Sequence, residues 1–293
     1  MGKLEEFFNR KYKLILLIPL IVFIFSVIII ANFNAKHGDY VQKDVSLKGG
    51  VSATIYLDTD VDIGGVQSYL KNELNEDVSV RTLTTIEDVN QGFLVEASNI
   101  NAEELKVILE KYLSMKLNDN NYFVEETGSK LGEDFYKQMV RAVVIAFVLM
   151  GITVFIIFRK IIPSIAVISS ALLDIIGTIA LIDIFGIKVS AAGVSALLLL
   201  IGYSVDTDIL LTTRMIKRRE GSIWERVMSA AKTGLTMTAA ALAATGVGYF
   251  FAQSLVLKQM FSIIFLGLIV DVIATYFMNA GLLRWYLEKK EHG

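Results

Sequence analysis

Long apolar blocks constrain this 293-residue chain more than any other feature of its sequence. A helix needs about 20 mainly apolar residues to cross a bilayer core of roughly 30 Å. The segments close to that length are Leu14–Ala31, Ala142–Phe158, Ile161–Ile182, Val189–Leu211, Thr233–Ala252 and Met260–Leu283. The sequence therefore predicts an α-helical polytopic membrane protein with six transmembrane helices.

The uneven spacing of these segments predicts the domain organisation. We expect a cytoplasmic N-terminus (1–13), transmembrane helix 1 (14–32), a polar domain (33–138), transmembrane helices 2–6 (139–285) with a cytoplasmic loop (214–232), and a cytoplasmic tail (286–293). The first apolar run is longer than the core of a typical secretion signal, and no small-x-small cleavage motif follows it. We therefore interpret it as an uncleaved anchor.

Basic residues in the short loops predict the orientation, because Lys and Arg are retained on the cytoplasmic side. Fifteen Lys and Arg residues fall on the side that holds both termini and loop 214–232, whereas the short loops opposite hold Lys188 and Lys258. Long translocated domains escape this rule, so the cations of the polar domain do not count against it. We expect a multi-pass protein of the cell membrane with both termini cytoplasmic and the large domain extracytoplasmic.

The composition excludes several kinds of active site. The chain has no cysteine and only two histidines, His37 and His292, which excludes a thiolate metal site and argues against a histidine-based zinc or triad enzyme. Between Lys36 and Lys137 there are 10 Lys and Arg against 19 Asp and Glu, so the polar domain is acidic. We expect no enzymatic activity, no cofactor, no metal and no nucleic-acid partner.

The polar domain alternates between strand-like and helix-like patterns. Alternating apolar residues predict strands, and apolar residues three or four apart predict helices. In chain order the segments are Val51–Leu57 (strand), Val61–Leu74 (helix), Val78–Ile86 (strand), Phe93–Ala97 (strand), a helix that Asn101 caps, and Tyr122–Val124 (strand). The order βαββαβ predicts an α+β ferredoxin-like domain between transmembrane helices 1 and 2. A spacer without a binding site is as consistent with this pattern as a binding role.

Four aspartates lie inside the predicted spans. Asp174 is in the middle of the third span, Asp206 and Asp208 are in the fourth, and Asp271 is in the middle of the sixth. An aspartate at the bilayer centre costs at least about 2.5–3.5 kcal/mol on insertion scales, so such a residue usually has a function. Gathering the acids in one polar cavity would lower that cost. We predict a proton relay, because such a cluster cannot be fully ionised when dry.

Polar residues near these acids suggest a hydrated path for protons. Ser204, Asp208 and Thr212 share one face of a helix, and Tyr203 lies three residues before Asp206. An alternative is that the acids make only structural hydrogen bonds or pair with a basic group near the cytoplasmic interface, Arg214 or Lys232. That alternative accounts for Asp208 as well as the relay does.

Several sequence stretches resemble the SecD/SecF family of protein-export membrane proteins, within the resistance-nodulation-division superfamily. They are SLKGGVSATI after the first span, GSKLGEDF before the second, and ALLDIIGTIALIDIFGIKVSAAGVSALLLLIGYSVDTDILLTTR through the third and fourth. The resemblance covers essentially the whole chain and is to the SecF-type subunit in its archaeal form. It implies that the chain assists translocation through the Sec translocon, with SecD, the translocating polypeptide and the lipid bilayer as partners, and that it uses the proton motive force.

Residue roles follow from the resemblance position by position. Bacterial SecF reads GYSINDT where this chain reads GYSVDTD, so Thr207 stands at the bacterial acid. The SecD form, with VDAN, instead matches Asp206 to the acid. The resemblance therefore assigns the proton relay to Asp206 first, and Asp174 matches the aspartate of the third span. Lys232 stands roughly where bacterial relatives have an arginine. Asp271 departs from the bacterial sixth span.

Three alternative hypotheses for the function compete with this interpretation. Half of a proton-driven small-molecule or lipid exporter of the same superfamily would also have six spans and one outer domain. An intramembrane aspartyl protease needs two membrane aspartates, but its G-x-G-D motif is absent here. A structural scaffold would not need acids in the middle of the membrane.

Overall fold

The computed structural model describes residues 12, 14–57, 61–74, 78–84, 90–97, 100–217, 221–252 and 254–291. The chain forms two compact units. The helical unit comprises the residues up to Gln42, Ala142–Ile187 and the residues from Ala192 onward. The α/β unit comprises Lys43–Arg141 and Lys188–Ala191. Most of the predicted N-terminus (1–13), part of loop 214–232 and the end of the tail lie outside the described residues.

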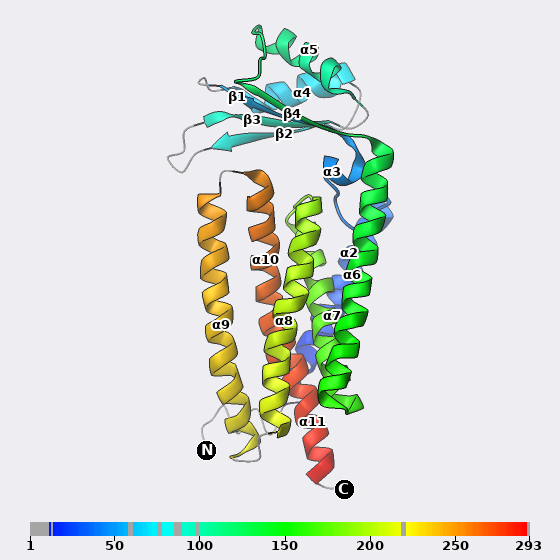
Figure 1. Ribbon diagram of the computed structural model, residues 1–293, viewed down its shortest axis with the longest axis vertical. Helices are drawn as coiled ribbons and strands as arrows, with labels where there is room; N and C mark the ends of the chain where they lie inside the picture. The colour runs from blue at the N-terminus through cyan, green and yellow to red at the C-terminus, as the bar shows by residue number, and fades with distance from the viewer. Residues whose placement is uncertain are drawn as a thin grey trace. The chain divides into compact units, whose positions relative to one another are not determined.

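Within the described residues, six helices are long and apolar enough to cross a membrane. They are α2 (Leu17–His37), α6 (Ser129–Phe158), α7 (Ile161–Ile184), α8 (Ala191–Lys217), α9 (Ile223–Phe251) and α10 (Leu255–Ile273), which continues through the π-helix η1 (Ala274–Asn279) into α11 (Ala280–Glu291) (Figure 1). Each predicted span coincides with one of these helices. The α7 and α8 spans are the most buried, whereas α2, α6 and α9 expose most of their side chains.

Two helices extend beyond the segments that hydropathy predicts. The helix α6 begins at Ser129, in the α/β unit, and α9 begins at Ile223. In the sequence, Ser222-x-x-Glu225 has the pattern of a capping box, and this box is present before α9. The Ser222 hydroxyl accepts from the Glu225 backbone NH, and the Glu225 carboxylate accepts from the Ser222 backbone NH. From the sequence alone, this pattern predicts a short amphipathic helix at the inner interface, separate from the fifth span and containing Ile223, Trp224, Val227 and Met228. That interpretation is wrong. The cap instead starts a helix that runs without a break into the fifth span.

The α/β unit has a four-stranded antiparallel sheet. Its elements are α3 (Val45–Lys48), β1 (Gly50–Tyr56), α4 (Ile63–Leu74), β2 (Val78–Thr84), β3 (Asn90–Ala97), α5 (Ala102–Leu113) and β4 (Tyr122–Thr127). The strand order is β2-β3-β1-β4, and the predicted sequence βαββαβ is observed. Both α4 and α5 cover the same face of the sheet (Figure 1). Their leucines pack on Val51, Ile55 and Phe93 to form the core.

The two glycine motifs at the borders of this unit meet in space. Gly49 and Gly50 have φ angles of 85° and 128°, which favour glycine. A Cβ atom on Gly132, in the first turn of α6, would lie 2.7 Å from the Gly49 backbone nitrogen. The backbone before β1 and the first turn of α6 can therefore lie in contact only because Gly49, Gly50 and Gly132 have no side chains.

Candidate functional site: a buried carboxylate cluster

Helix α7 contributes Asp174 to a buried site in the helical unit. The Asp174 side chain is only 1% exposed. Ser170 and Thr178, one turn before and one turn after it, are fully buried on the same face. The Thr178 hydroxyl donates to the Asp174 backbone carbonyl at 2.6 Å, so it bonds within its own helix.

Helix α8 contributes Asp208 rather than Asp206. Asp208 is fully buried together with Ser204 and Thr212, the residues one turn away on either side. Asp206 is exposed. Residues two apart on an α-helix point about 200° away from one another, so two such carboxylates cannot both enter one bundle. The expectation that Asp206 gathers with Asp174 and Asp271 is therefore wrong for its position. Asp208 occupies that place.

The last span contributes Asp271, Thr275 and Asn279, all fully buried. They follow one another at intervals of four residues. Thr275 and Asn279 lie in the π-helical turns of η1, which has a wider turn than an α-helix. Single π turns inside α-helices often occur at functional sites. Thr275 and Asn279 were not among the candidates from the sequence, although their spacing from Asp271 was a signal that could have found them.

Hydroxyl groups join the three carboxylates. The Ser204 hydroxyl donates to Oδ2 of Asp174. The Thr207 hydroxyl lies 3.2 Å from Oδ1 of Asp271 and also donates to the Ser204 carbonyl at 2.8 Å. These two contacts connect α8 with α7 on one side and with α10 on the other.

One hydroxyl lies between two acids. Oγ1 of Thr275 is 3.0 Å from Oδ1 of Asp208 and 3.1 Å from Oδ1 of Asp271. A threonine hydroxyl has a single proton to donate. Both contacts are hydrogen bonds only if a proton on one of the carboxyl groups is donated to the threonine oxygen. We call Asp174, Asp208 and Asp271, with Ser204, Thr207, Thr275 and Asn279, the carboxylate cluster.

The carboxylate cluster has unused hydrogen-bonding capacity. Oδ1 of Asp174, Oδ2 of Asp208 and the hydroxyl of Ser170 are buried and have no hydrogen-bond partner in the described part of the chain. Among the described residues, no Lys, Arg or His forms an ion pair with the three acids. The arrangement can therefore accept protons, but no fixed positive charge neutralises it.

The other candidates from the sequence lie elsewhere. Arg214 donates from Nη1 to the backbone carbonyl and, at 2.8 Å, to the hydroxyl of Ser229, so it joins α8 to the start of α9. It does not pair with any acid in the part of the chain that the structure describes. Lys232 is exposed on α9. The Tyr203 hydroxyl is buried without a hydrogen-bond partner. Ser204 and Thr207 are the two supporting residues that the structure brings to the carboxylates.

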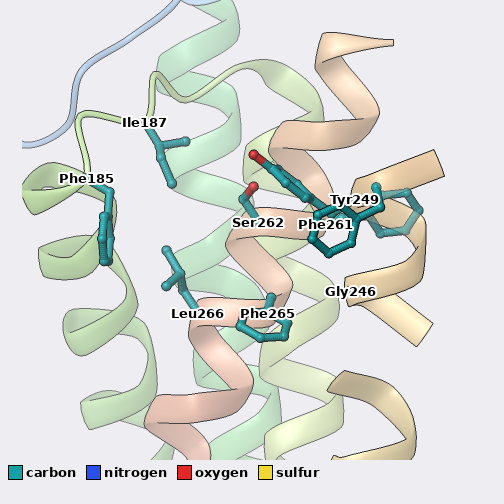
Figure 2. Close-up of a pocket in the computed structure, with 9 residues that line it drawn as sticks. Phe185, Ile187, Gly246, Tyr249, Phe261, Ser262, Phe265 and Leu266 are labelled. Carbon is teal, nitrogen blue, oxygen red and sulfur yellow. The ribbon is translucent and has the colours of Figure 1, made fainter. Parts of the chain in front are cut away.

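A cavity of about 450 Å³ lies apart from the carboxylate cluster. It is formed by the chain just after α7, the end of α9 and the first half of α10 (Figure 2). Its lining residues are Phe185, Ile187, Gly246, Tyr249, Phe250, Phe261, Ser262, Phe265 and Leu266. The lining is aromatic and aliphatic and offers no carboxylate, amine or imidazole. It is suited to apolar contacts and not to moving a proton.

No metal chemistry is suggested by the described side chains. Within the ranges that the structure describes, no group of three or more His, Asp or Glu residues has an arrangement that could hold a metal ion. The three acids come close through shared hydroxyl and amide donors, which is a different arrangement from a set of oxygens converging on one point.

Fold and site define a class: a polytopic membrane protein with buried acids on three spans and one α/β unit inserted after the first span. The family profile described as "Protein export membrane protein SecD/SecF, C-terminal" matches residues 107–289. The SecF protein-export membrane protein of Methanolacinia petrolearia is 35% identical over 99% of both chains. That of Methanothermobacter thermautotrophicus is 36% identical over 95% of this chain and 94% of its own. The chain belongs to the SecF family of protein-export membrane proteins.

Solved structures show the same fold in a longer chain. The crystal structure of SecDF, a translocon-associated membrane protein from Thermus thermophilus, superposes with a TM-score of 0.75 at 17% identity. It covers 96% of this chain, but this chain spans only 38% of that one. A second SecDF structure, in a super-membrane-facing form, gives a TM-score of 0.63. The fold of this chain therefore corresponds to one part of a larger SecDF chain.

Proposed function

We propose that this protein is the SecF subunit of a SecD–SecF complex, which assists translocation of polypeptides through the Sec translocon by using the proton motive force. Family membership supports the role in export. The observation that carries the energy coupling is the carboxylate cluster, in which three buried acids on three spans share hydroxyl and amide donors and have no basic partner among the described residues.

Protons are the simplest means of neutralising these acids. A buried charge is costly unless it is paired or hydrogen-bonded. Asp174 and Asp208 each have one carboxylate oxygen without a partner, and a proton on either oxygen removes most of that cost. One charge that crosses 100 mV contributes about 2.3 kcal/mol, which is enough to favour one helix arrangement over another.

The orientation in the membrane is part of the proposal. The excess of Lys and Arg in the loops beside the termini favours cytoplasmic termini and an extracytoplasmic α/β unit. The order βαββαβ with strand order β2-β3-β1-β4 supports a ferredoxin-like description of that unit. We propose that this unit meets the translocating polypeptide, and that the lipid bilayer surrounds the exposed faces of α2, α6 and α9.

Asp206 has a different place in the proposal. It lies on an exposed stripe of α8 with Ser195, Leu199 and Gly202, spaced at three or four residues. A Cβ atom on Gly202 would meet nothing within 4 Å. An exposed carboxylate in a span needs a polar neighbour, because lipid cannot solvate it. We propose that a SecD helix packs on this stripe and provides that neighbour.

Aspartate-to-asparagine variants test the proposal, because asparagine keeps the shape and removes the ionisable group. The complex is reconstituted with SecD and the translocon in vesicles, and export is measured with and without a proton gradient. We expect Asp174→Asn, Asp208→Asn and Asp271→Asn to lose at least tenfold of the gradient-stimulated rate while assembling normally. Asp206→Asn should weaken co-purification with SecD. Full gradient stimulation in Asp208→Asn would refute the relay.

A further inference from the structure

The short segment between α7 and α8 is built into the α/β unit. Residues Lys188–Ala191 belong to that unit, whereas Ile187 and Ala192 belong to the helical unit. Val189 and Ser190 are 2% and 3% exposed, as buried as core residues. The connection between the third and fourth spans is therefore a packed element and not a free loop.

Backbone contacts attach this segment to the chain before β1. Lys43 and Val189 form a parallel β-bridge, and the Asp44 backbone NH donates to the Val189 carbonyl at 3.0 Å. The Ala191 NH donates to the Ser46 hydroxyl at 3.2 Å. The segment is thus bound at its middle and at its end.

An ion pair attaches the segment to the centre of the sheet. Nζ of Lys188 lies 2.6 Å from Oε2 of Glu96, with side chains 16% and 9% exposed. Glu96 belongs to β3, which pairs with both β1 and β2. Asp44 is the other acid near this pair, and burial is the main cause that raises its pKa. If one member of a buried pair is removed, the other is left as an uncompensated charge, so the loss of either residue alone disrupts this attachment.

We propose that Lys188 is a positioning residue for energy coupling, because its ion pair with Glu96 makes the α7–α8 segment the link between the carboxylate cluster and the α/β unit. This inference rests on the proposed function. The chain passes between the units at two other places, Gln42–Lys43 and Arg141–Ala142, which lead to α2 and α6. Neither of those helices carries a carboxylate of the cluster.

The helices on either side of the segment are the ones that proton transfer would displace. Asp174 lies on α7 and Asp208 on α8, and α7 ends at Ile184 only a few residues before the attached segment. A change in the spacing of α7 and α8 must therefore move both ends of the segment. Because the segment is bonded to β3 and to the start of β1, such a movement is passed to the sheet.

The test uses the complete SecD–SecF–translocon complex in vesicles. Lys188→Met removes the charge, Lys188→Arg keeps it, and the double variant Lys188→Glu with Glu96→Lys exchanges the two charges. Lys258→Met, in the first turn of α10, is the matched control. For each variant we measure gradient-stimulated export, assembly with SecD, and the response of β3 to a proton gradient by hydrogen exchange.

We expect Lys188→Met to lose about tenfold of the gradient-stimulated rate and the gradient-dependent change in β3 exchange, while assembly and gradient-independent export persist. Lys188→Arg and the exchanged pair should regain at least half of the stimulation, and Lys258→Met should be unchanged. A folded Lys188→Met complex with full stimulation would overturn the inference.

A second variant removes the dependence on how Lys188→Met folds. Two glycines inserted between Gly186 and Ile187 leave the ion pair intact and make the connection between α7 and the attached segment longer and more flexible. This insertion should also abolish stimulation, and full stimulation in it would contradict the link. Asp208→Asn, measured beside these variants, separates the two ideas. If it keeps full stimulation, the proposed function fails. If Asp208→Asn loses stimulation while Lys188→Met and the insertion keep it, the proposed function stands and only the role of Lys188 is contradicted.

Discussion

The side-chain amide of Asn279 donates to Oδ1 of Asp208 at 2.8 Å, although 71 residues separate them in the sequence. The same amide lies 3.3 Å from the Thr212 hydroxyl. Asn279 is the last residue of η1, so this contact ties the π-helical turns to the C-terminal half of α8. It extends the carboxylate cluster by one turn beyond the acids.

Asn279→Leu should destabilise the helical unit. The variant keeps a similar volume but leaves the buried carboxyl of Asp208 without its amide donor, which costs about 1–3 kcal/mol. The free energy of unfolding in mixed micelles measures the loss. Thr236→Val is the control, because Thr236 is exposed and, within the ranges that the structure describes, its hydroxyl bonds only to its own helix. An equal loss in both variants would show that the amide contact has no special importance.

Gly132→Ala should destabilise the α/β unit by about 1–3 kcal/mol, as overpacking of a close contact does. The added Cβ atom would lie 2.7 Å from the Gly49 nitrogen and 3.0 Å from the Lys48 carbonyl carbon, and backbone atoms cannot rotate away. Gly128→Ala is the matched control, since a Cβ atom there meets nothing within 4 Å. Hydrogen exchange of β1 measures both. Equal protection in the two variants would contradict the close approach.

Asp44→Asn should stabilise the α/β unit near neutral pH. Burial raises the pKa of Asp44 above its ordinary value of 3.8, although two hydrogen bonds from Ser46 act in the opposite direction. The folded state then binds the proton more tightly than the unfolded state. Wild-type stability therefore falls as the pH rises from the unfolded-state pKa of Asp44 to its folded-state pKa. The advantage of asparagine should shrink as the pH is lowered through the folded pKa. Thermal unfolding of both proteins between about pH 3 and pH 7, where a carboxyl group with a raised pKa titrates, measures the difference in stability. A difference that does not vary with pH would refute this account.

Ser222→Ala should fray the first turn of α9 and cost about 1 kcal/mol, because Ser222 caps that helix with its hydroxyl. Ser254 also precedes a helix, α10, but its side chain makes no cap hydrogen bond. Ser254→Ala should therefore have a much smaller effect. Spin labels in the first turn of each helix compare their mobility. Greater fraying in the Ser254 variant would contradict the assignment of the cap.

The sequence alone determined the elements of this protein. Apolar runs set the positions of the six spans, and alternating patterns set the strands and helices of the α/β unit in their observed order. Both signals are local, since each depends on the residues of one segment and on the periodicity of one helix or strand. The capping box at Ser222 was equally local, yet the helix that follows it was interpreted too narrowly.

Only the tertiary structure decided which carboxylates meet. Asp206 and Asp208 have the same surroundings in the sequence, and a family resemblance favoured Asp206. The packing of α7 and α10 against one side of α8 buries Asp208 and leaves Asp206 exposed. The sequence predicted that Ser204, Asp208 and Thr212 share one face of the helix. It did not predict that this face is the buried one, because burial depends on neighbouring helices that the local sequence does not specify. For the same reason, the ion pair between Lys188 and Glu96 was unforeseen, because it joins residues 92 positions apart through the folding of the whole unit.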